Sequence, residues 1–188
     1  TNGRVRLAAA PVVADGKLFV VDTDAVVHAF NADTGAKLWS LATSSDKENR
    51  NAAFGGGVSV EGGRVFATNG LGDVVAIDAA AGTEVWRKKP GGPLRGAPTL
   101  FLGNAYVVSQ DNQLFALAPA DGAVVWTQSG TPETQGVFGV AAPAAAQGTV
   151  IAGYSSGELA AYRYENGRTL WADALALTSI STQVGSLT

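Results

Sequence analysis

The chain has 188 residues, of which 46% are hydrophobic and 15% are charged, a composition that indicates one large or two small globular domains and excludes a disordered chain. A formal net charge of −3 and a pI near 5.1 argue against a nucleic-acid-binding surface, which needs clustered lysine and arginine. The absence of cysteine excludes disulfides, thiolate metal sites and cysteine nucleophiles from these residues.

The N-terminal part of the chain reads as four short strands that end at polar turns. We expect these strands at residues 10–14, 17–21, 25–30 and 37–41. Tight turns are predicted at Asp15-Gly16, Asp22-Thr23-Asp24 and Asp33-Thr34-Gly35. Short apolar runs joined by Gly, Asp and Asn are typical of antiparallel hairpins, so this unit predicts one small four-stranded sheet.

The same succession of four strands follows three more times along the chain. The second unit is expected at 58–60, 64–68, 74–77 and 84–87, the third at 99–102, 105–109, 113–117 and 124–127, and the fourth at 144–146, 149–153, 158–162 and 169–172. Such regular spacing of short strands and turns predicts an all-β chain built from an internal repeat.

Each unit closes on a tryptophan that lies four residues after a glycine. These structural repeat positions are Gly35 and Trp39, Gly82 and Trp86, Gly122 and Trp126, and Gly167 and Trp171. A second glycine precedes each turn glycine by 19 residues, whereas the connectors to the next unit vary in length. Constant units with variable connectors are typical of proteins whose connectors carry the function. Four equivalent tryptophans favour packing between units over ligand stacking.

A four-stranded sheet cannot bury both faces alone, so successive sheets must stack face to face. The predicted fold class is therefore all-β, a β-propeller built of four-stranded antiparallel blades, with four blades in this chain. One partial propeller would occupy 1–188, with blades at about 8–41, 57–88, 97–128 and 142–173 and with 174–188 as a connector to a following blade. We expect open sheet faces at both ends unless something covers them.

The form of the repeat resembles one propeller family in particular. Ser40, Arg87, Thr127 and Ala172 follow the four tryptophans, so the Trp-Asp mark of WD40 blades is missing. The pattern of alanine, a hydrophobic residue, glycine six positions after the alanine and tryptophan four positions later is instead similar to pyrroloquinoline-quinone (PQQ) type repeats. That family includes quinone-dependent dehydrogenases and non-enzymatic members.

Within the PQQ-type repeats, the chain resembles the BamB family of outer-membrane protein assembly factors. The resemblance rests on residues 10–16, 30–35, 55–63 and 120–126, in the same order. It implies an eight-bladed propeller, of which this chain would cover about half. It also implies a non-catalytic scaffold of the β-barrel assembly machinery, which binds BamA and assists folding and insertion of outer-membrane β-barrel proteins, with unfolded barrel proteins as further partners.

The same resemblance implies a location on the periplasmic side of the bacterial outer membrane. No apolar run approaches the roughly 20 residues of a membrane-spanning helix, and no signal peptide is visible. The chain starts at Thr1 and has no methionine, so we expect any targeting signal or lipid anchor to lie upstream. Pairing of two copies to close the propeller is left open by the sequence.

Two long connectors, Thr43–Phe54 and Gln128–Val140, are the candidate contact loops for the partner. In the family, the connector after the third tryptophan docks BamA through a Leu-x-Leu-Arg motif. Alignment on Pro143 places Gln135, Val137 and Phe138 there, with Phe138 in place of the arginine. These three residues are the predicted partner-binding positions, and a solvated connector is the competing interpretation.

Catalytic chemistry has little support in the residues. His28 is the one histidine and falls in an ordinary strand column, so no triad or multi-histidine metal site can form. Asp22, Asp24, Asp73 and Asp111 lie near turns and are interpreted as turn formers. We therefore expect no enzyme activity, no cofactor and no metal. The alternatives are part of a PQQ-dependent dehydrogenase-like propeller and a generic PQQ-repeat protein-interaction module.

Overall fold

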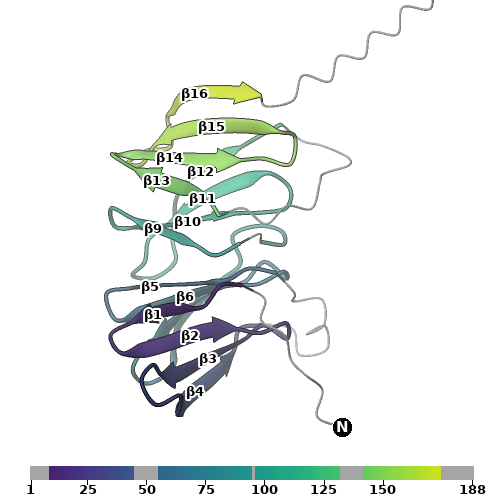
Figure 1. The fold of residues 1–188 in the computed structure, drawn as a ribbon. Helices are drawn as coiled ribbons and strands as arrows, with labels where there is room; N and C mark the ends of the chain where they lie inside the picture. Colours follow the sequence, from purple (N-terminus) through teal and green to yellow (C-terminus); the bar gives the residue numbers. More distant parts are fainter. Residues whose placement is uncertain (1–8, 45–54, 95, 132–141, 175–188) are drawn as a thin grey trace, which may run out of the picture.

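The computed structural model describes residues 9–44, 55–94, 96–131 and 142–174. Its 16 strands form four separate antiparallel sheets, each made of four strands that are consecutive in the chain (Figure 1). The predicted fold class is therefore confirmed. No helix among these residues is long and apolar enough to cross a membrane.

Each sheet is one blade, and its strands pair in chain order. Blade 1 contains β1 (Val12–Ala14), β2 (Lys17–Val21), β3 (Val26–Asn31) and β4 (Lys37–Ala42). Blade 2 contains β5 (Val58–Glu61), β6 (Arg64–Thr68), β7 (Val74–Asp78) and β8 (Glu84–Lys88). Blade 3 contains β9 (Thr99–Phe101), β10 (Asn104–Val108), β11 (Gln113–Leu117) and β12 (Val124–Ser129). Blade 4 contains β13 (Ala144–Ala146), β14 (Thr149–Gly153), β15 (Glu158–Arg163) and β16 (Thr169–Ala174).

The first hairpin of every blade turns through two residues with positive φ. In blade 1 these are Asp15 and Gly16, at 48° and 70°, and in blade 3 they are Leu102 and Gly103, at 45° and 78°. Two consecutive left-handed residues are the mark of the tight turn whose twist matches that of the flanking strands. The early glycine of each unit therefore sets the register of its first two strands.

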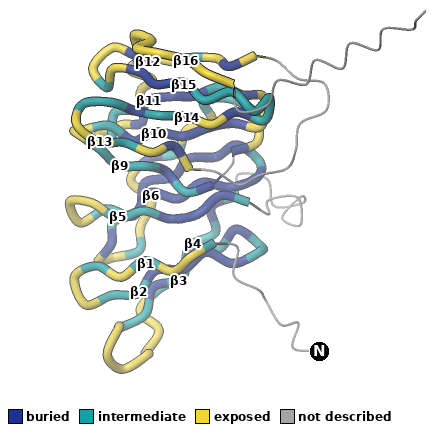
Figure 2. Tube along the Cα trace, turned by 45° about the horizontal axis from the view of Figure 1, so that its top comes forward, coloured by how far each residue is buried: buried dark blue, intermediate teal, exposed yellow. Residues whose placement is uncertain are grey.

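The first strand of each blade contacts the first strand of the next, in the order β1, β5, β9 and β13. The blades consequently follow one another in a single direction, with blades 1 and 4 at opposite ends (Figure 1). Three hydrophobic clusters fill the three spaces between them, one for each pair of successive blades. Buried residues concentrate in these spaces, and all six residues of β16 are exposed (Figure 2).

The two outer strands of each blade share one irregularity that positions the tryptophan. Ala29 lies opposite Trp39 and Phe30 lies opposite Lys37, so Leu38 is an extra residue that bulges out of β4. The same register shift follows Ala76, Ala116 and Ala161. All four alanines are fully buried beside their tryptophans, which explains why this column holds a small residue.

Candidate functional site

The tryptophan column forms the contact between one blade and the next. Trp39 Nε1 donates to the Ala79 carbonyl at 3.1 Å, Trp86 Nε1 to Pro119 at 2.9 Å and Trp126 Nε1 to Tyr164 at 2.8 Å. In each case the acceptor lies three residues before the turn glycine of the following blade. The indole thus binds the neighbouring blade's last turn through both its nitrogen and its ring.

The turn glycines are required by the close approach of these rings. A Cβ atom at Gly82 would lie 2.4 Å from Trp39 Cγ, and one at Gly122 would lie 2.7 Å from Trp86 Cε3. Such distances are too short for a side chain, and the glycines also have φ near +70°, where L-residues are strained. Gly and Trp therefore recur together because they form one contact that crosses from blade to blade.

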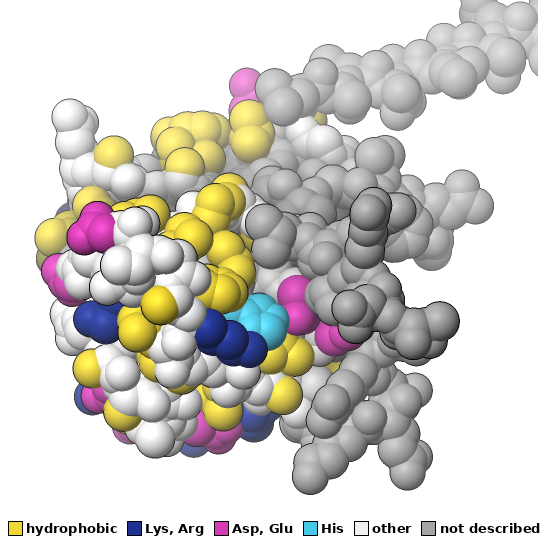
Figure 3. Space-filling model, turned by 60° about the horizontal axis from the view of Figure 1, so that its bottom comes forward, with side chains coloured by type: hydrophobic (Ala, Val, Ile, Leu, Met, Phe, Trp, Pro, Cys, Tyr) yellow, Lys and Arg dark blue, Asp and Glu magenta, His cyan; other side chains and the backbone are white. Residues whose placement is uncertain are grey.

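Blades 1 and 4 each keep one half of this contact without a counterpart among the described residues. Trp171 is 47% exposed, whereas Trp86 and Trp126 are 8% and 9% exposed. A Cβ atom at Gly35 would meet no atom within 4 Å. Within the described ranges, these two groups therefore lie on the end faces of the stack of blades. Figure 3 views the blade 1 end, where the histidine lies between a basic and an acidic side chain, with hydrophobic side chains above and below it.

The start of the first candidate contact loop is held by blade 2. Thr43 is fully buried, and its amide and hydroxyl both donate to the Ala25 carbonyl. The Thr43 carbonyl accepts from Asn69 Nδ2 at 3.0 Å and from Arg87 Nη1. Arg87 also pairs with Glu84 at 2.7 Å, which orients its guanidinium. The connector therefore begins at a fixed point between two blades.

The start of the second candidate loop is held in the same way between blades 3 and 4. Asn112 Nδ2 donates to the Thr131 carbonyl at 2.9 Å, and Asn112 Oδ1 accepts from the amide and hydroxyl of Ser155. Gly130 lies so close to the Tyr154 ring that a Cβ atom there would be 2.5 Å from Tyr154 Cγ. Asn112 thus joins the loop to blade 4.

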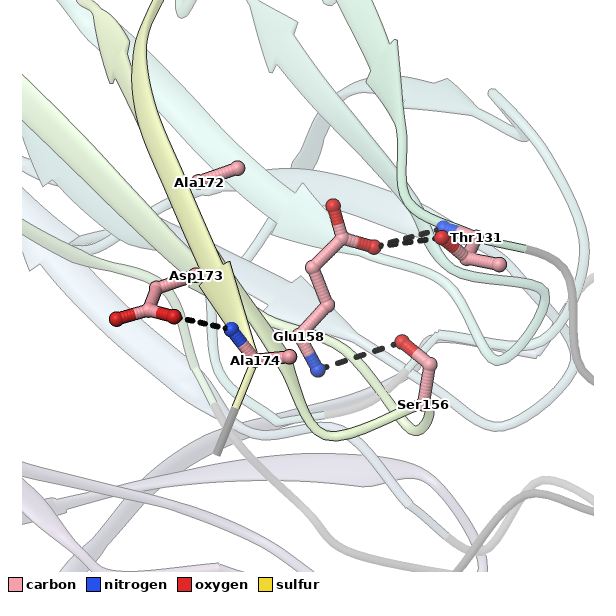
Figure 4. Close-up of a pocket in the computed structure, with 6 residues that line it drawn as sticks. All are labelled: Thr131, Ser156, Glu158, Ala172, Asp173 and Ala174. Carbon is pink, nitrogen blue, oxygen red and sulfur yellow. Dashed lines mark hydrogen bonds between the residues drawn. The ribbon is translucent and has the colours of Figure 1, made fainter. Parts of the chain in front are cut away.

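A pocket of about 490 Å³ lies beside this second loop, lined by Thr131, Ser156, Glu158, Ala172, Asp173 and Ala174 (Figure 4). Glu158 Oε2 accepts from the Thr131 amide and from its hydroxyl, each at 3.0 Å. These bonds tie the carboxylate to the loop. The pocket is open and acidic, since Glu158 and Asp173 line it.

The predicted partner-binding positions Gln135, Val137 and Phe138 lie outside the described residues. The structure describes Thr43 and Ser44 of the first candidate loop and residues 128–131 of the second. What it adds is the anchoring of both loop starts, which depends on Asn69 and Asn112. Sequence analysis did not single out these two asparagines, because neither recurs in its repeat column. The other blades hold Asp22, Ser109 and Tyr154 at the position of Asn69, and Ala25, Gly72 and Gly157 at the position of Asn112.

A second surface that the sequence did not reveal is a row of exposed apolar side chains on the outer strands. Its members are the bulged residues, with exposed fractions of 45%, 44%, 48% and 44% for Leu38, Val85, Val125 and Leu170. A period-two strand pattern cannot locate a bulge in advance, which is why this row was missed. The row gives every blade one hydrophobic position on its outer edge.

The residues weighed for catalysis have structural partners. His28 Nε2 lies 2.7 Å from Asp22 Oδ2, while Asp22 Oδ1 accepts from the amides of Asp24 and Val26. This carboxylate therefore fastens the turn between β2 and β3. Asp111 accepts from the Ser109 hydroxyl in the matching turn of blade 3. Within the described ranges, no group of three His, Cys, Asp or Glu residues could hold a metal ion.

Two tyrosines form a buried polar pair inside blade 4. The hydroxyls of Tyr154 and Tyr162 lie 2.9 Å apart. Burial is the main cause that raises the pKa of both phenols, and the hydrogen bond between the two hydroxyls raises the pKa of Tyr154 further. Both tyrosines are therefore neutral at physiological pH and serve the core between blades 3 and 4.

The chain is similar in sequence and in fold to several known proteins. The outer membrane protein assembly factor BamB of Moranella endobia (strain PCIT) is 29% identical over 181 residues, which are 94% of this chain and 47% of that protein. The crystal structure of BamB from Moraxella catarrhalis has a TM-score of 0.81 at 18% identity, over 98% of this chain and 55% of that one. A quinohemoprotein alcohol dehydrogenase from Comamonas testosteroni has a TM-score of 0.75 at 19% identity, over 90% of this chain and 35% of that one.

Structural likeness at such identities shows a shared fold, whereas the sequence match shows the family. The chain spans about half the length of the curated relatives it matches. The family model described as outer membrane protein assembly factor BamB matches residues 2–51 and 42–188, nearly the whole chain. The chain belongs to the BamB family of outer membrane protein assembly factors.

Proposed function

We propose that this chain is a non-catalytic scaffold that acts in outer-membrane protein assembly by binding a BamA-type partner on the periplasmic side of the membrane. The observation that carries the proposal is the family match over residues 2–51 and 42–188. The relatives with this name are outer membrane protein assembly factors, and the same role is the simplest one for a chain that aligns with them over 94% of its length.

The partner-binding site in this proposal is the pair of long connectors after blades 1 and 3. Recognition residues are frequently carried on loops that a rigid scaffold positions. Both loop starts have that support, since Thr43 is bonded to blade 2 and Thr131 to blades 3 and 4. Val137 and Phe138, in the second of these connectors, would supply a hydrophobic anchor for the partner.

Docking through loops is favoured over capture of unfolded barrel strands along the blade edges. Every outer strand carries a bulge, at Leu38, Val85, Val125 and Leu170. A bulge interrupts the ladder of free backbone groups that an added strand needs, and natural sheets use it to block edge-to-edge pairing. We therefore assign the edges a minor part in partner binding.

The proposal is tested by calorimetric titration of the chain with the purified periplasmic domains of a BamA-type protein. The variant Val137→Asp with Phe138→Asp should weaken binding at least about tenfold, the loss of roughly 1.4 kcal/mol or more. The control is Leu102→Asn, which removes a 56% exposed apolar side chain from the β9–β10 turn at a φ that asparagine tolerates. Equal affinity of the loop variant and the control would remove this loop from the site.

The rival function is part of a quinone-dependent dehydrogenase, and the fold shared with the Comamonas testosteroni enzyme favours it. A quinone site of that kind needs an acidic base, a calcium ion and, in many members, adjacent cysteines. The chain has no cysteine, and its described part brings no three candidate ligands together. These residues do not fit the cofactor.

A further inference from the structure

A second pocket, of about 360 Å³, lies where the outer strand of blade 2 meets that of blade 3. Its volume is at the lower end of the range for ligand pockets. The residues that line it are Lys88, Lys89, Pro90, Gly122, Ala123 and Val124. Both sides of this pocket belong to described blades in the middle of the stack, so neither side is an end face.

The pocket is held in shape by the contact between blade 2 and the last turn of blade 3. Trp86 Nε1 donates to the Pro119 carbonyl at 2.9 Å, and Arg64 Nη1 donates to the same carbonyl at 2.8 Å. A Cβ atom at Gly122 would lie 2.6 Å from Lys88 Cγ, so the stem of Lys88 rests on this turn. A rigid support of this kind reduces the entropy that binding must remove.

The two lysines give the pocket a positive charge. Both are exposed, and neither forms an ion pair with a described residue. Glu84, on the same strand as Lys88, pairs instead with Arg87, and Asp121 accepts from the Ala123 amide within its own turn. An anionic group that enters the pocket would therefore meet two ammonium groups without displacing an existing partner.

The other blades show that the repeat does not require this basic pair. The position of Lys88, two residues after the tryptophan, holds Leu41, Gln128 and Asp173 in blades 1, 3 and 4, and the next position holds Ala42, Ser129 and Ala174. At the joint between blades 3 and 4, Gln128 Nε2 donates to the Gly167 carbonyl at 3.0 Å. A neutral side chain is thus sufficient to join two blades, and the basic pair needs another explanation.

An apolar wall lies beside the charged one. Val124 lines the pocket and is 50% exposed, and the bulged residue Val125 next to it is 48% exposed. Pro90 and Ala123 complete this wall. Because the bulge interrupts the outer edge of β12, a partner would be recognised by its side chains rather than as an added strand. The pocket therefore suits a carboxylate that is accompanied by an apolar side chain.

We propose that this pocket binds an extended segment of a partner protein that presents carboxylates and an apolar side chain on one face. The proposal adds an interaction surface to the chain, and it depends neither on the BamA-type partner nor on the two connectors. An anionic membrane surface is the competing occupant. It suits the site less, because surfaces that dock on a bilayer insert protruding apolar groups, whereas Lys88, Lys89 and Val124 surround a hollow.

Two-dimensional amide NMR of the isotope-labelled chain tests the proposal, because it detects weak binding residue by residue. The probe is the peptide acetyl-Ser-Glu-Ala-Phe-Ala-Asp-Ser-amide, whose Glu, Phe and Asp lie on one face when it is extended. We expect saturable shifts concentrated at the amides of Lys88, Lys89, Ala123 and Val124. A probe with Gln and Asn in place of Glu and Asp should bind about fivefold more weakly or worse, and so should a probe with Ser in place of Phe.

Two double variants connect the charge to the pocket. Lys88→Gln with Lys89→Gln should weaken binding of the acidic probe about fivefold or more. Lys17→Gln with Lys37→Gln removes the same charge from blade 1 and should leave the affinity unchanged. Added salt should weaken binding to the unchanged chain, because it screens exposed charges.

A matched pair of valine variants tests the apolar wall. Val124→Thr keeps a β-branched side chain and should weaken binding of the acidic probe. Val13→Thr makes the same change at a 65% exposed valine of β1 and should not. Equal affinity of the two valine variants would contradict a part for the apolar wall.

The proposal is overturned by equal binding of the acidic and the amide probes, by shifts that appear elsewhere, or by full affinity in the double variant of Lys88 and Lys89. Cosedimentation with vesicles of pure phosphatidylglycerol provides the second assay. Vesicle binding that this double variant loses, without shifts from the peptide, would assign the pocket to a bilayer surface instead. Either failure would leave the proposed binding of a BamA-type partner untouched, since that proposal is tested at Val137 and Phe138.

Discussion

Replacing Trp126 and Trp171 by alanine tests whether the tryptophans stabilise the contacts between blades or the individual blades. Trp126 and Trp171 occupy the same place in blades 3 and 4, each opposite a buried alanine. Trp126 is 9% exposed, donates to the Tyr164 carbonyl and lies 5.7 Å from Tyr106 and 6.3 Å from Tyr162, measured between ring centroids. Trp171 is 47% exposed and has no blade beyond it in the described chain.

The expected cost follows from what each substitution uncovers. Trp126→Ala removes a buried indole, a change that typically costs about 3–5 kcal/mol, and it includes the hydrogen bond to Tyr164, worth about 1 kcal/mol. Trp171→Ala removes a half-exposed ring, so roughly half the area-dependent part and no hydrogen bond are lost, about 1–2 kcal/mol. The predicted difference in unfolding free energy is about 2–3 kcal/mol.

Urea unfolding followed by far-ultraviolet circular dichroism measures both values, at concentrations where sedimentation shows a single copy. Val125→Ala, a change at a 48% exposed neighbour, serves as the control and should cost less than about 0.5 kcal/mol. Equal losses for Trp126→Ala and Trp171→Ala would refute the reasoning, because the tryptophans would then stabilise their own blades and not the joints between them.

Three further predictions follow from contacts of single residues. Gly167→Ala and Gly103→Ala share a strained φ, which costs about 1 kcal/mol. Only at Gly167 would the added Cβ atom meet a ring, 2.7 Å from Trp126 Cε3, so thermal unfolding of Gly167→Ala should reveal about 1–3 kcal/mol more loss. Asn69→Ala, at a fully buried residue that donates to Thr43 and Asp73, should cost about 2–3 kcal/mol in urea unfolding, whereas the exposed Asn166→Ala should cost under about 0.5. Burial raises the pKa of Tyr154 and Tyr162 above the ordinary value near 10. The contribution of the two neutral phenols to the unfolding free energy is therefore complete below about pH 10 and is lost as pH rises beyond it. Tyr154→Phe should make this alkaline fall of the unfolding free energy shallower, and an unchanged slope would contradict the assignment.

The repeat itself could be predicted from the sequence because both of its signals are local. A glycine in a two-residue turn and a glycine four residues before a tryptophan set the hairpins, so strands such as Lys17–Val21 and Gln113–Leu117 were predicted with their observed limits. Packing along the tryptophan column was also foreseen, since four equivalent large rings need a common partner.

Other features depend on contacts between residues far apart in the chain, and local patterns do not contain them. The bulge at Leu38 depends on how β4 pairs with β3, which alternation of apolar residues does not specify. The anchoring of Thr43 by Asn69 joins residues 26 positions apart, and the acceptor of Trp39 lies 40 positions away. The partner-binding assignment of Gln135, Val137 and Phe138 stays a prediction, because it rests on resemblance and these residues lie outside the described ranges.

The most direct test of the scaffold account is a pair of calorimetric titrations on one preparation of the chain, one with the periplasmic domains of a BamA-type protein and the other with pyrroloquinoline quinone plus calcium. The account predicts saturable binding of the protein partner and no heat of binding for the quinone. Saturable quinone binding without partner binding would contradict it and assign the chain to an oxidoreductase.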